Sequence, residues 1–128
     1  MKYFTMSEFE CRGFQRGEGC CNGLPYDGMN DVLLQKLNEL REKIGYPIHV
    51  TCGYRCPSHN ADVGGVYNSQ HVLGTAADIY CDELSVDQLA EAAAEIGFDG
   101  IGRYYDSEFV HVDCRDNGES PNGYTWEG

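Results

Sequence analysis

The sequence predicts an α+β fold, a single domain in which helices flank a central, mostly antiparallel sheet. The chain has 128 residues, a length that suits one domain with one core. Its hydrophobic fraction of 41% is typical of a globular protein. Stretches with helical periodicity are mixed with short strand-like stretches, and no internal repeat or low-complexity tract interrupts them. We therefore expect residues 1–128 to form one domain.

The first predicted element is an amphipathic helix over residues 28–44. Its apolar residues recur every three or four positions, and it ends near Gly45 and Pro47. Residues 48–52 then have the pattern of a short strand, and residues 53–57 have that of the turn leading out of it.

A short helix, a polar loop and a strand follow in the middle of the chain. Ser58 is a suitable N-cap for a helix that runs to about Val63. Residues 66–74 read as a polar loop, and loops carried by a rigid scaffold are where chemistry tends to lie. Residues 76–81 have the pattern of a strand.

The last third of the chain predicts a helix and then two strands. Ser85 is expected to cap a helix that runs through Ile96. The two strands are predicted at residues 100–105 and 109–114, and residues 106–108 form the turn between them. The tail from Arg115 contains Gly, Asn and Pro and reads as loop, although the large side chain of Trp126 is suited to pack back on the domain.

Charge and hydrophobicity exclude several classes of partner. Nine basic against twenty-one acidic residues give a formal charge of −12, which argues against nucleic acid. No stretch approaches the roughly 20 apolar residues of a membrane span. The N-terminus lacks the apolar region and cleavage site of a secretory signal, so any export would need another route. Since no long apolar stripe is left over, we expect a monomer.

Seven cysteines are many for a chain of this length, and their odd number means that not all can pair within it. The close pairs Cys20/Cys21 and Cys52/Cys56 suit either disulfides or metal binding. Cys11, Cys20 and Cys21 lack the C-x-x-C spacing that structural zinc sites usually show. We therefore favour disulfides or free buried thiols, with a second metal site as the alternative.

Three side chains have the chemistry of a catalytic zinc site. Such a site takes three protein ligands, often histidine and carboxylate, and leaves a fourth position for water. His71, Asp78 and His111 are candidates for these ligands. Their spacing alone gives modest support, because His111 is far from the other two along the chain.

A longer motif contains two of these candidates. Residues 69–78, Ser-Gln-His-Val-Leu-Gly-Thr-Ala-Ala-Asp, match the pattern S-x-H-x-x-G-x-A-x-D. The sequence thereby resembles the D-Ala-D-Ala carboxypeptidase family of zinc peptidases, peptidase family M15, which has the hedgehog/DD-peptidase fold. The match continues through residues 53–60 upstream and 108–113 downstream, so it covers roughly residues 28–115.

The resemblance implies a role for each residue of the pattern. His71, Asp78 and His111 would bind Zn²⁺. Glu108 would be the general base, taking a proton from the attacking water and passing it to the leaving amine. Arg55 would hold the substrate and polarise its carbonyl group.

The position of the general base raises a geometric question. Alternate residues of a strand share a face, so Asp113, two after His111, is the simpler choice than Glu108, three before it. We expect Glu108 to lie in the turn before the strand, and Asp113 to orient a ligand. Ser69 either satisfies the loop backbone or contacts the substrate, and both interpretations stay open.

As a whole, the resemblance implies zinc-dependent hydrolysis of peptide bonds in peptidoglycan stem peptides. The enzyme would be a D-Ala-D-Ala carboxypeptidase or a lysin-type endopeptidase that acts on the bacterial cell wall, as phage or prophage lysis enzymes do. The alternative is a zinc-containing binding or signalling module on the same fold. The presence of Glu108 argues against this alternative, because a structural zinc needs no base.

Overall fold

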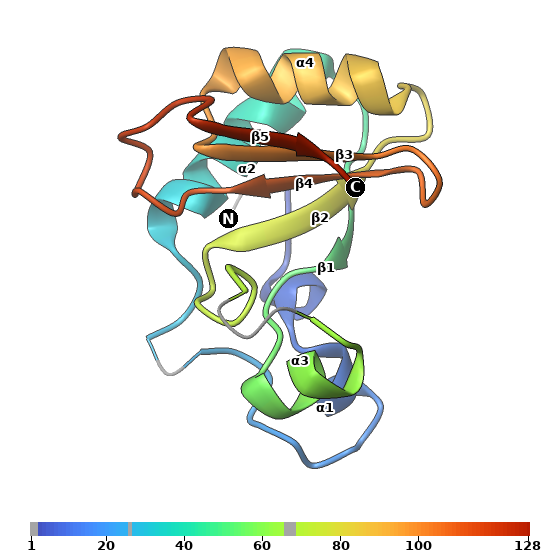
Figure 1. The fold of residues 1–128 in the computed structure, drawn as a ribbon, viewed down its shortest axis with the longest axis vertical. Coiled ribbons are helices and arrows are strands. Elements are labelled where there is room, and N and C mark those ends of the chain that lie inside the picture. The colour runs from blue at the N-terminus through green and yellow to red at the C-terminus, as the bar shows by residue number, and fades with distance from the viewer. Residues whose placement is uncertain (1–2, 26, 66–68) are drawn as a thin grey trace.

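One five-stranded sheet forms the centre of the fold (Figure 1). The computed structural model describes residues 3–25, 27–65 and 69–128. The strands lie in the order β1 (His49–Cys52), β2 (Ala76–Tyr80), β4 (Phe109–Asp113), β3 (Gly100–Tyr104) and β5 (Tyr124–Glu127). All neighbours are antiparallel except β3 and β5, which are parallel. This mixed sheet with its helices confirms the predicted α+β class.

Two helices cover one face of the sheet. Helices α2 (Asp31–Ile44) and α4 (Val86–Ile96) contact each other, and α4 also contacts β3 and β4 (Figure 1). The helices and the sheet share one apolar core, whose fully buried members include Leu33, Leu37, Ile79, Val110 and Val112. Because side chains alternate along a strand, the residues between these strand positions face the opposite side of the sheet.

Local capping sets where the helices begin and end. Asn30 caps α2 by accepting a hydrogen bond from Leu33 N, so the helix begins at Asp31 rather than at the predicted residue 28. Gly45 ends it in the left-handed conformation at φ 75°. Ser85 caps α4 as predicted, and Gln88 completes a capping box.

The predicted cap of the short helix is wrong. Helix α3 (Pro57–Asp62) begins two residues earlier than expected, and Cys56 is its N-cap. The Cys56 thiol accepts a hydrogen bond from His59 N at 3.3 Å. Proline favours the first position of a helix, since it has no N–H to leave unpaired there. Ser58 therefore lies inside the helix.

The prediction of a loop for the whole tail is also wrong, because the tail ends in β5. Gly102 of β3 pairs with Trp126, and a Cβ on Gly102 would lie 2.5 Å from the indole. The missing side chain lets the Trp126 ring cross β3. There its Nε1 donates to the Tyr104 hydroxyl at 2.8 Å.

Two further elements that the sequence did not indicate lie before α2. These are a 3₁₀ turn, η1 (Met6–Phe9), and the short helix α1 (Arg12–Gln15). Phe9 is fully buried, and its carbonyl accepts a hydrogen bond from Tyr54 N at 2.8 Å. The N-terminal segment is thereby held against the chain that leaves β1, near α3 (Figure 1). None of the helices in the described residues has the length and apolar character needed to cross a bilayer.

Candidate active site

The sheet register brings the candidate ligands together. Asp78 of β2 pairs directly with His111 of β4, on the face away from α2 and α4. Oδ1 of Asp78 lies 3.1 Å from Nδ1 of His111 and 3.2 Å from Nε2 of His71. The two imidazole rings meet edge to face, with centroids 5.2 Å apart. Residues from a loop and two strands thus converge on one carboxylate oxygen.

Each imidazole is oriented by a partner on its other nitrogen. Nδ1 of His71 lies 2.8 Å from the carbonyl oxygen of Gly53, and Nε2 of His111 lies 2.8 Å from Oδ2 of Asp113. Both partners are acceptors, so these nitrogens carry the ring hydrogens. The nitrogens that face Asp78 are then free of hydrogen in the neutral rings and can bind a metal.

Asp113 is itself held in place. It is fully buried, and Arg115 donates to both of its carboxylate oxygens at 2.8 and 3.0 Å. Burial raises the pKa of Asp113, but the contacts with His111 and Arg115 outweigh burial and lower the pKa to about 2. Asp113 therefore stays ionised and acts as an acceptor toward His111.

The loop that carries His71 is fixed by its own backbone. Ser69 Oγ accepts a hydrogen bond from His71 N at 3.2 Å, and the His71 carbonyl accepts one from Arg55 N at 3.2 Å. Ser69 and His71 are both buried. The loop joins β2 through Gly74, whose φ of 73° favours glycine.

Electrostatics make the site attractive to a cation. Burial by itself lowers the pKa of His71 and raises the pKa of Asp78. The contact between the two side chains shifts each pKa in the opposite direction, and this effect is larger than that of burial. The pKa of His71 rises to about 10, and that of Asp78 falls to about 2 through its bonds with His111 and His71. The field that holds a proton on His71 would equally favour a divalent cation.

The donor set fits zinc. With Zn–N bonds of about 2.0–2.1 Å, neighbouring ligand atoms of a tetrahedral site lie about 3.3 Å apart. The contacts of Asp78 with His71 and His111, at 3.2 and 3.1 Å, are close to that separation. Two imidazole nitrogens and one carboxylate oxygen also match the ligand types of a catalytic zinc.

A cysteine that the sequence analysis did not assign to the site lies beside it. The donor atoms of Cys52, His71 and Asp78 all lie within 4.8 Å of one another. The Cys52 sulfur is 3.6 Å from Nδ1 of His71, the nitrogen that donates to Gly53. Cys52 therefore approaches the nitrogen of His71 that does not contact Asp78.

The candidate ligands open onto a cavity of about 510 Å³. Arg55 and Ser69 also line it, and Arg55 Nη2 donates to Ser69 Oγ at 3.4 Å. Nε of Arg55 is buried and has no hydrogen-bond partner among the described residues. The cavity thus contains a guanidinium group with donors to spare.

Glu108 lies outside this cavity. It is exposed in the turn between β3 and β4, in the left-handed region at φ 58°, and it lines a neighbouring hollow of about 410 Å³. Phe109 lines both hollows. The expected place of Glu108, in the turn before the strand, agrees with the structure. Its carboxylate, however, is not gathered with the three candidate ligands.

The structure adds residues that the sequence analysis did not propose for the site. Arg115, Tyr104 and Trp126 line the cavity, and the Trp126 ring lies 5.0 Å from that of His111. The alternation His-x-Asp-x-Arg over residues 111–115 is a signal that could have indicated Arg115. Nothing in the sequence tied Trp126 to the site. Arg103, by contrast, pairs with Asp87 and does not line this cavity.

The chain is similar in sequence to known proteins. The Peptidase M15 family matches it over residues 2–113. A zinc D-Ala-D-Ala carboxypeptidase of Streptomyces albus G is 39% identical over 71 residues, which are 55% of this chain and 28% of that protein. A probable peptidoglycan L,D-endopeptidase MepK of Haemophilus influenzae is 32% identical over 93 residues, with coverages of 66% and 50%. The chain therefore spans half or less of the length of these two relatives.

Proposed function

Since this chain belongs to the Peptidase M15 family, we propose that it is a zinc-dependent peptidase that cleaves peptide bonds in peptidoglycan stem peptides. The main support is the contact of two oriented histidines with one carboxylate oxygen at the wall of a cavity. His71, Asp78 and His111 would be the metal ligands. Bound zinc would supply Lewis acidity and lower the pKa of water to about 7.

Arg55 is proposed to stabilise the carbonyl oxygen of the scissile bond. This oxygen becomes anionic as the carbonyl is attacked, and a guanidinium group keeps its charge at any working pH. Arg55 lines the cavity, and its side-chain contact with Ser69 at 3.4 Å is long enough to be given up. Ser69 would then be free to contact the substrate.

Glu108 is proposed as the general base that takes a proton from the attacking water and passes it to the leaving amine. Asp113 cannot take this role, because it is fully buried and bonded to both His111 and Arg115. Glu108 directly precedes Phe109, which lines the cavity, and this role requires the exposed turn to bring the carboxylate to the cavity when substrate binds. Catalytic contacts often tighten only in the substrate complex.

Purified protein would be assayed for zinc and for fragments released from purified peptidoglycan. We expect His111→Ala to lose activity together with the zinc of this site, about one ion per chain. Glu108→Gln and Arg55→Ala should keep zinc and lose roughly 10²-fold or more in turnover. An exposed neighbour, Asp106→Asn, serves as the matched control. Full activity in Glu108→Gln would exclude it as the base, and zinc-free wild-type protein would overturn the proposed site.

The position of the cleaved bond is a separate question. A carboxypeptidase needs a cation for the terminal carboxylate of its substrate. In this cavity Arg115 is occupied by Asp113, which leaves Arg55 for that task or for an internal carbonyl. Stem peptides ending in D-Ala-D-Ala, with a free or an amidated C-terminus, would distinguish the two. A carboxypeptidase would cleave only the free form, whereas an endopeptidase would cleave both.

A zinc-containing binding module is the second candidate, and the position of Glu108 outside the cavity favours it. Such a module would hold zinc and bind stem peptides without releasing a product. Zinc and peptide binding without hydrolysis in the assay above would support this alternative.

A further inference from the structure

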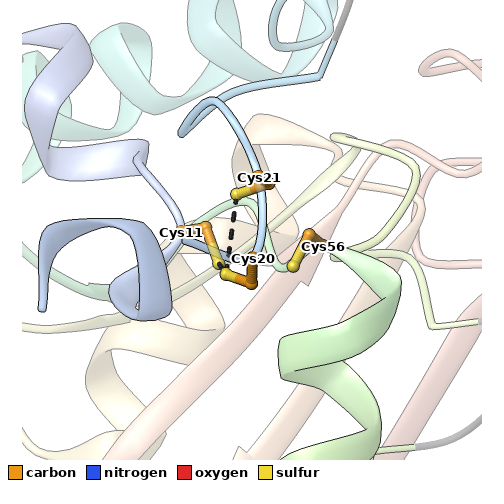
Figure 2. A group of neighbouring side chains, drawn as sticks. All are labelled: Cys11, Cys20, Cys21 and Cys56. Atoms are coloured by element: carbon orange, nitrogen blue, oxygen red, sulfur yellow. Dashed lines mark hydrogen bonds between the residues drawn. The ribbon is translucent and has the colours of Figure 1, made fainter. Parts of the chain in front are cut away.

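Four cysteines gather at a place that the proposed active site does not use (Figure 2). The sulfur atoms of Cys11, Cys20, Cys21 and Cys56 all lie within 4.8 Å of one another. Cys20 Sγ is 3.9 Å from both Cys11 Sγ and Cys21 Sγ. Cys11 and Cys56 are buried, and the other two are half-buried.

The four thiols come from three separate segments. Cys11 is the N-cap of α1, Cys20 and Cys21 lie in the loop after it, and Cys56 is the N-cap of α3. Figure 2 shows their side chains turned toward one another. The space between α1 and this loop is filled, because a Cβ on Gly13 would lie 2.8 Å from Cys20 Sγ. Folding thus directs the thiols to one point.

The separations do not fit disulfides. A disulfide has an S–S length of about 2.05 Å. All seven cysteines are free thiols in this structure, so the disulfides that the sequence suggested are not supported. Four sulfurs bound to zinc at about 2.3 Å would instead lie about 3.8 Å apart along the edges of a tetrahedron. The distances of 3.9 Å from Cys20 Sγ to Cys11 Sγ and to Cys21 Sγ agree with this edge.

We propose that Cys11, Cys20, Cys21 and Cys56 bind a structural Zn²⁺, a second metal site in addition to the active site. Four sulfur ligands in tetrahedral arrangement are typical of zinc or iron–sulfur sites, and four protein ligands leave no position for a substrate. Backbone N–H groups also point at the sulfurs, from Gly23 to Cys21 and from His59 to Cys56, both at 3.3 Å. Such donors stabilise thiolates.

The ion would join the N-terminal segment to the chain that carries Arg55. Cys56 directly follows Arg55. Cys11 lies two residues after Phe9, whose carbonyl accepts the hydrogen bond from Tyr54 N. Binding of one ion by all three segments would therefore fix the backbone on both sides of Arg55. This site does not depend on the proposed peptidase activity.

Elemental analysis of protein purified under reducing conditions tests the proposal. We expect about two zinc ions per wild-type chain, one for each site. Cys20→Ser and Cys21→Ser, in a half-buried loop, should each lose about one ion, while His111→Ala should lose the other. Cys81→Ala is the matched control, because it removes a buried thiol outside the cluster and should keep both ions.

Cobalt substitution gives a readout that needs no cysteine variant. In His111→Ala, which keeps all four cysteines, Co²⁺ should produce thiolate-to-cobalt charge-transfer absorption. Iron in place of zinc would overturn the choice of ion. Zinc content unaffected by Cys20→Ser and Cys21→Ser, or an intact mass that lacks thiol hydrogens after reducing purification, would overturn the site. Loss of activity alone bears only on the proposed peptidase function.

Discussion

At the scale of single residues, the site depends on groups that orient the ligands as much as on the ligands themselves. His111 reaches Asp78 with one nitrogen because its other nitrogen donates to Asp113. Asp113 keeps its charge because Arg115 binds both of its oxygens. This arrangement of carboxylate, histidine and metal position is common in zinc proteins, where it fixes the ring and raises its basicity.

The first prediction concerns Asp113. Asp113→Asn should weaken zinc binding at the active site by about 10–100-fold, because a neutral amide in place of the carboxylate makes the His111 ring a weaker metal ligand. Competition with a zinc chelator would measure the zinc affinity. The measurement uses a Cys20→Ser background, in which the proposed four-cysteine site is removed and only the active site binds zinc. Asp106→Asn, a change of the same kind in an exposed turn, is the control. Equal affinities of the two variants would contradict the proposed role of Asp113.

The second prediction separates His111 from Cys52 as the third ligand. The Cys52 sulfur lies 3.6 Å from Nδ1 of His71, the nitrogen that also faces the Gly53 carbonyl, whereas Asp78 lies at Nε2. Nδ1 of His111 lies 3.1 Å from the Asp78 oxygen that contacts His71, so we expect His111 rather than Cys52 to complete the ligand set. We expect Cys52→Ser to retain zinc at the active site and His111→Ala to lose it, as measured by elemental analysis. Loss of zinc in Cys52→Ser would assign this cysteine as a ligand.

At the scale of helices and strands, the sequence predicted the elements with strong periodicity and missed the short ones. Helices α2 and α4 and strands β1 to β4 appear within a few residues of their predicted bounds. Strand β5 was missed because long-range contacts create it. Asp99 is fully buried and accepts hydrogen bonds from the backbone of Asp116, Gly118 and Ser120, which shapes the turns leading into β5. A local pattern does not record such contacts.

The same reasoning applies to the candidate site. A motif in the sequence indicated His71, Asp78 and His111, and the register of β2 with β4 places Asp78 opposite His111. The contribution of Trp126 depends on the parallel pairing of β5 with β3, which the sequence did not reveal. For a similar reason the sequence suggested a second metal site only as an alternative, since Cys56 lies far along the chain from Cys11, Cys20 and Cys21 and meets them only in the folded structure.

The third prediction tests how β5 is held on the sheet. Gly102→Ala would place a methyl group 2.5 Å from the Trp126 ring and should destabilise the fold by about 1–3 kcal/mol through overpacking. Urea denaturation would measure the loss. In a Trp126→Ala background the same change should cost much less, because the indole is gone. If Gly102→Ala lowered the stability equally in both backgrounds, the Trp126 ring would not be the reason that position 102 requires glycine.

At the scale of the whole molecule, the apolar core and the polar site lie on opposite faces of one sheet. Side-chain alternation along β2 and β4 directs Ile79, Val110 and Val112 to the helices, and it directs Asp78 and His111 to the cavity. The sheet therefore couples global stability to the charges of the site. Several of these charged groups have shifted pKa values in the folded protein, so the stability of the metal-free protein should depend on pH.

The fourth prediction follows from this coupling. Burial raises the pKa of Asp113, but His111 and Arg115 outweigh it and lower the pKa to about 2, against about 3.9 in an unfolded chain. Between these values the unfolded state binds more protons than the folded state, so stability falls as the pH falls. The metal-free protein should lose on the order of 2 kcal/mol from Asp113 as the pH is lowered from above 4 to about 2. Urea denaturation in the presence of a chelator would measure this loss.

Asp113→Asn, which has no proton to gain at this position, should show a shallower dependence on pH. If both proteins lost stability equally over this range, the depressed pKa of Asp113 would not contribute to acid unfolding.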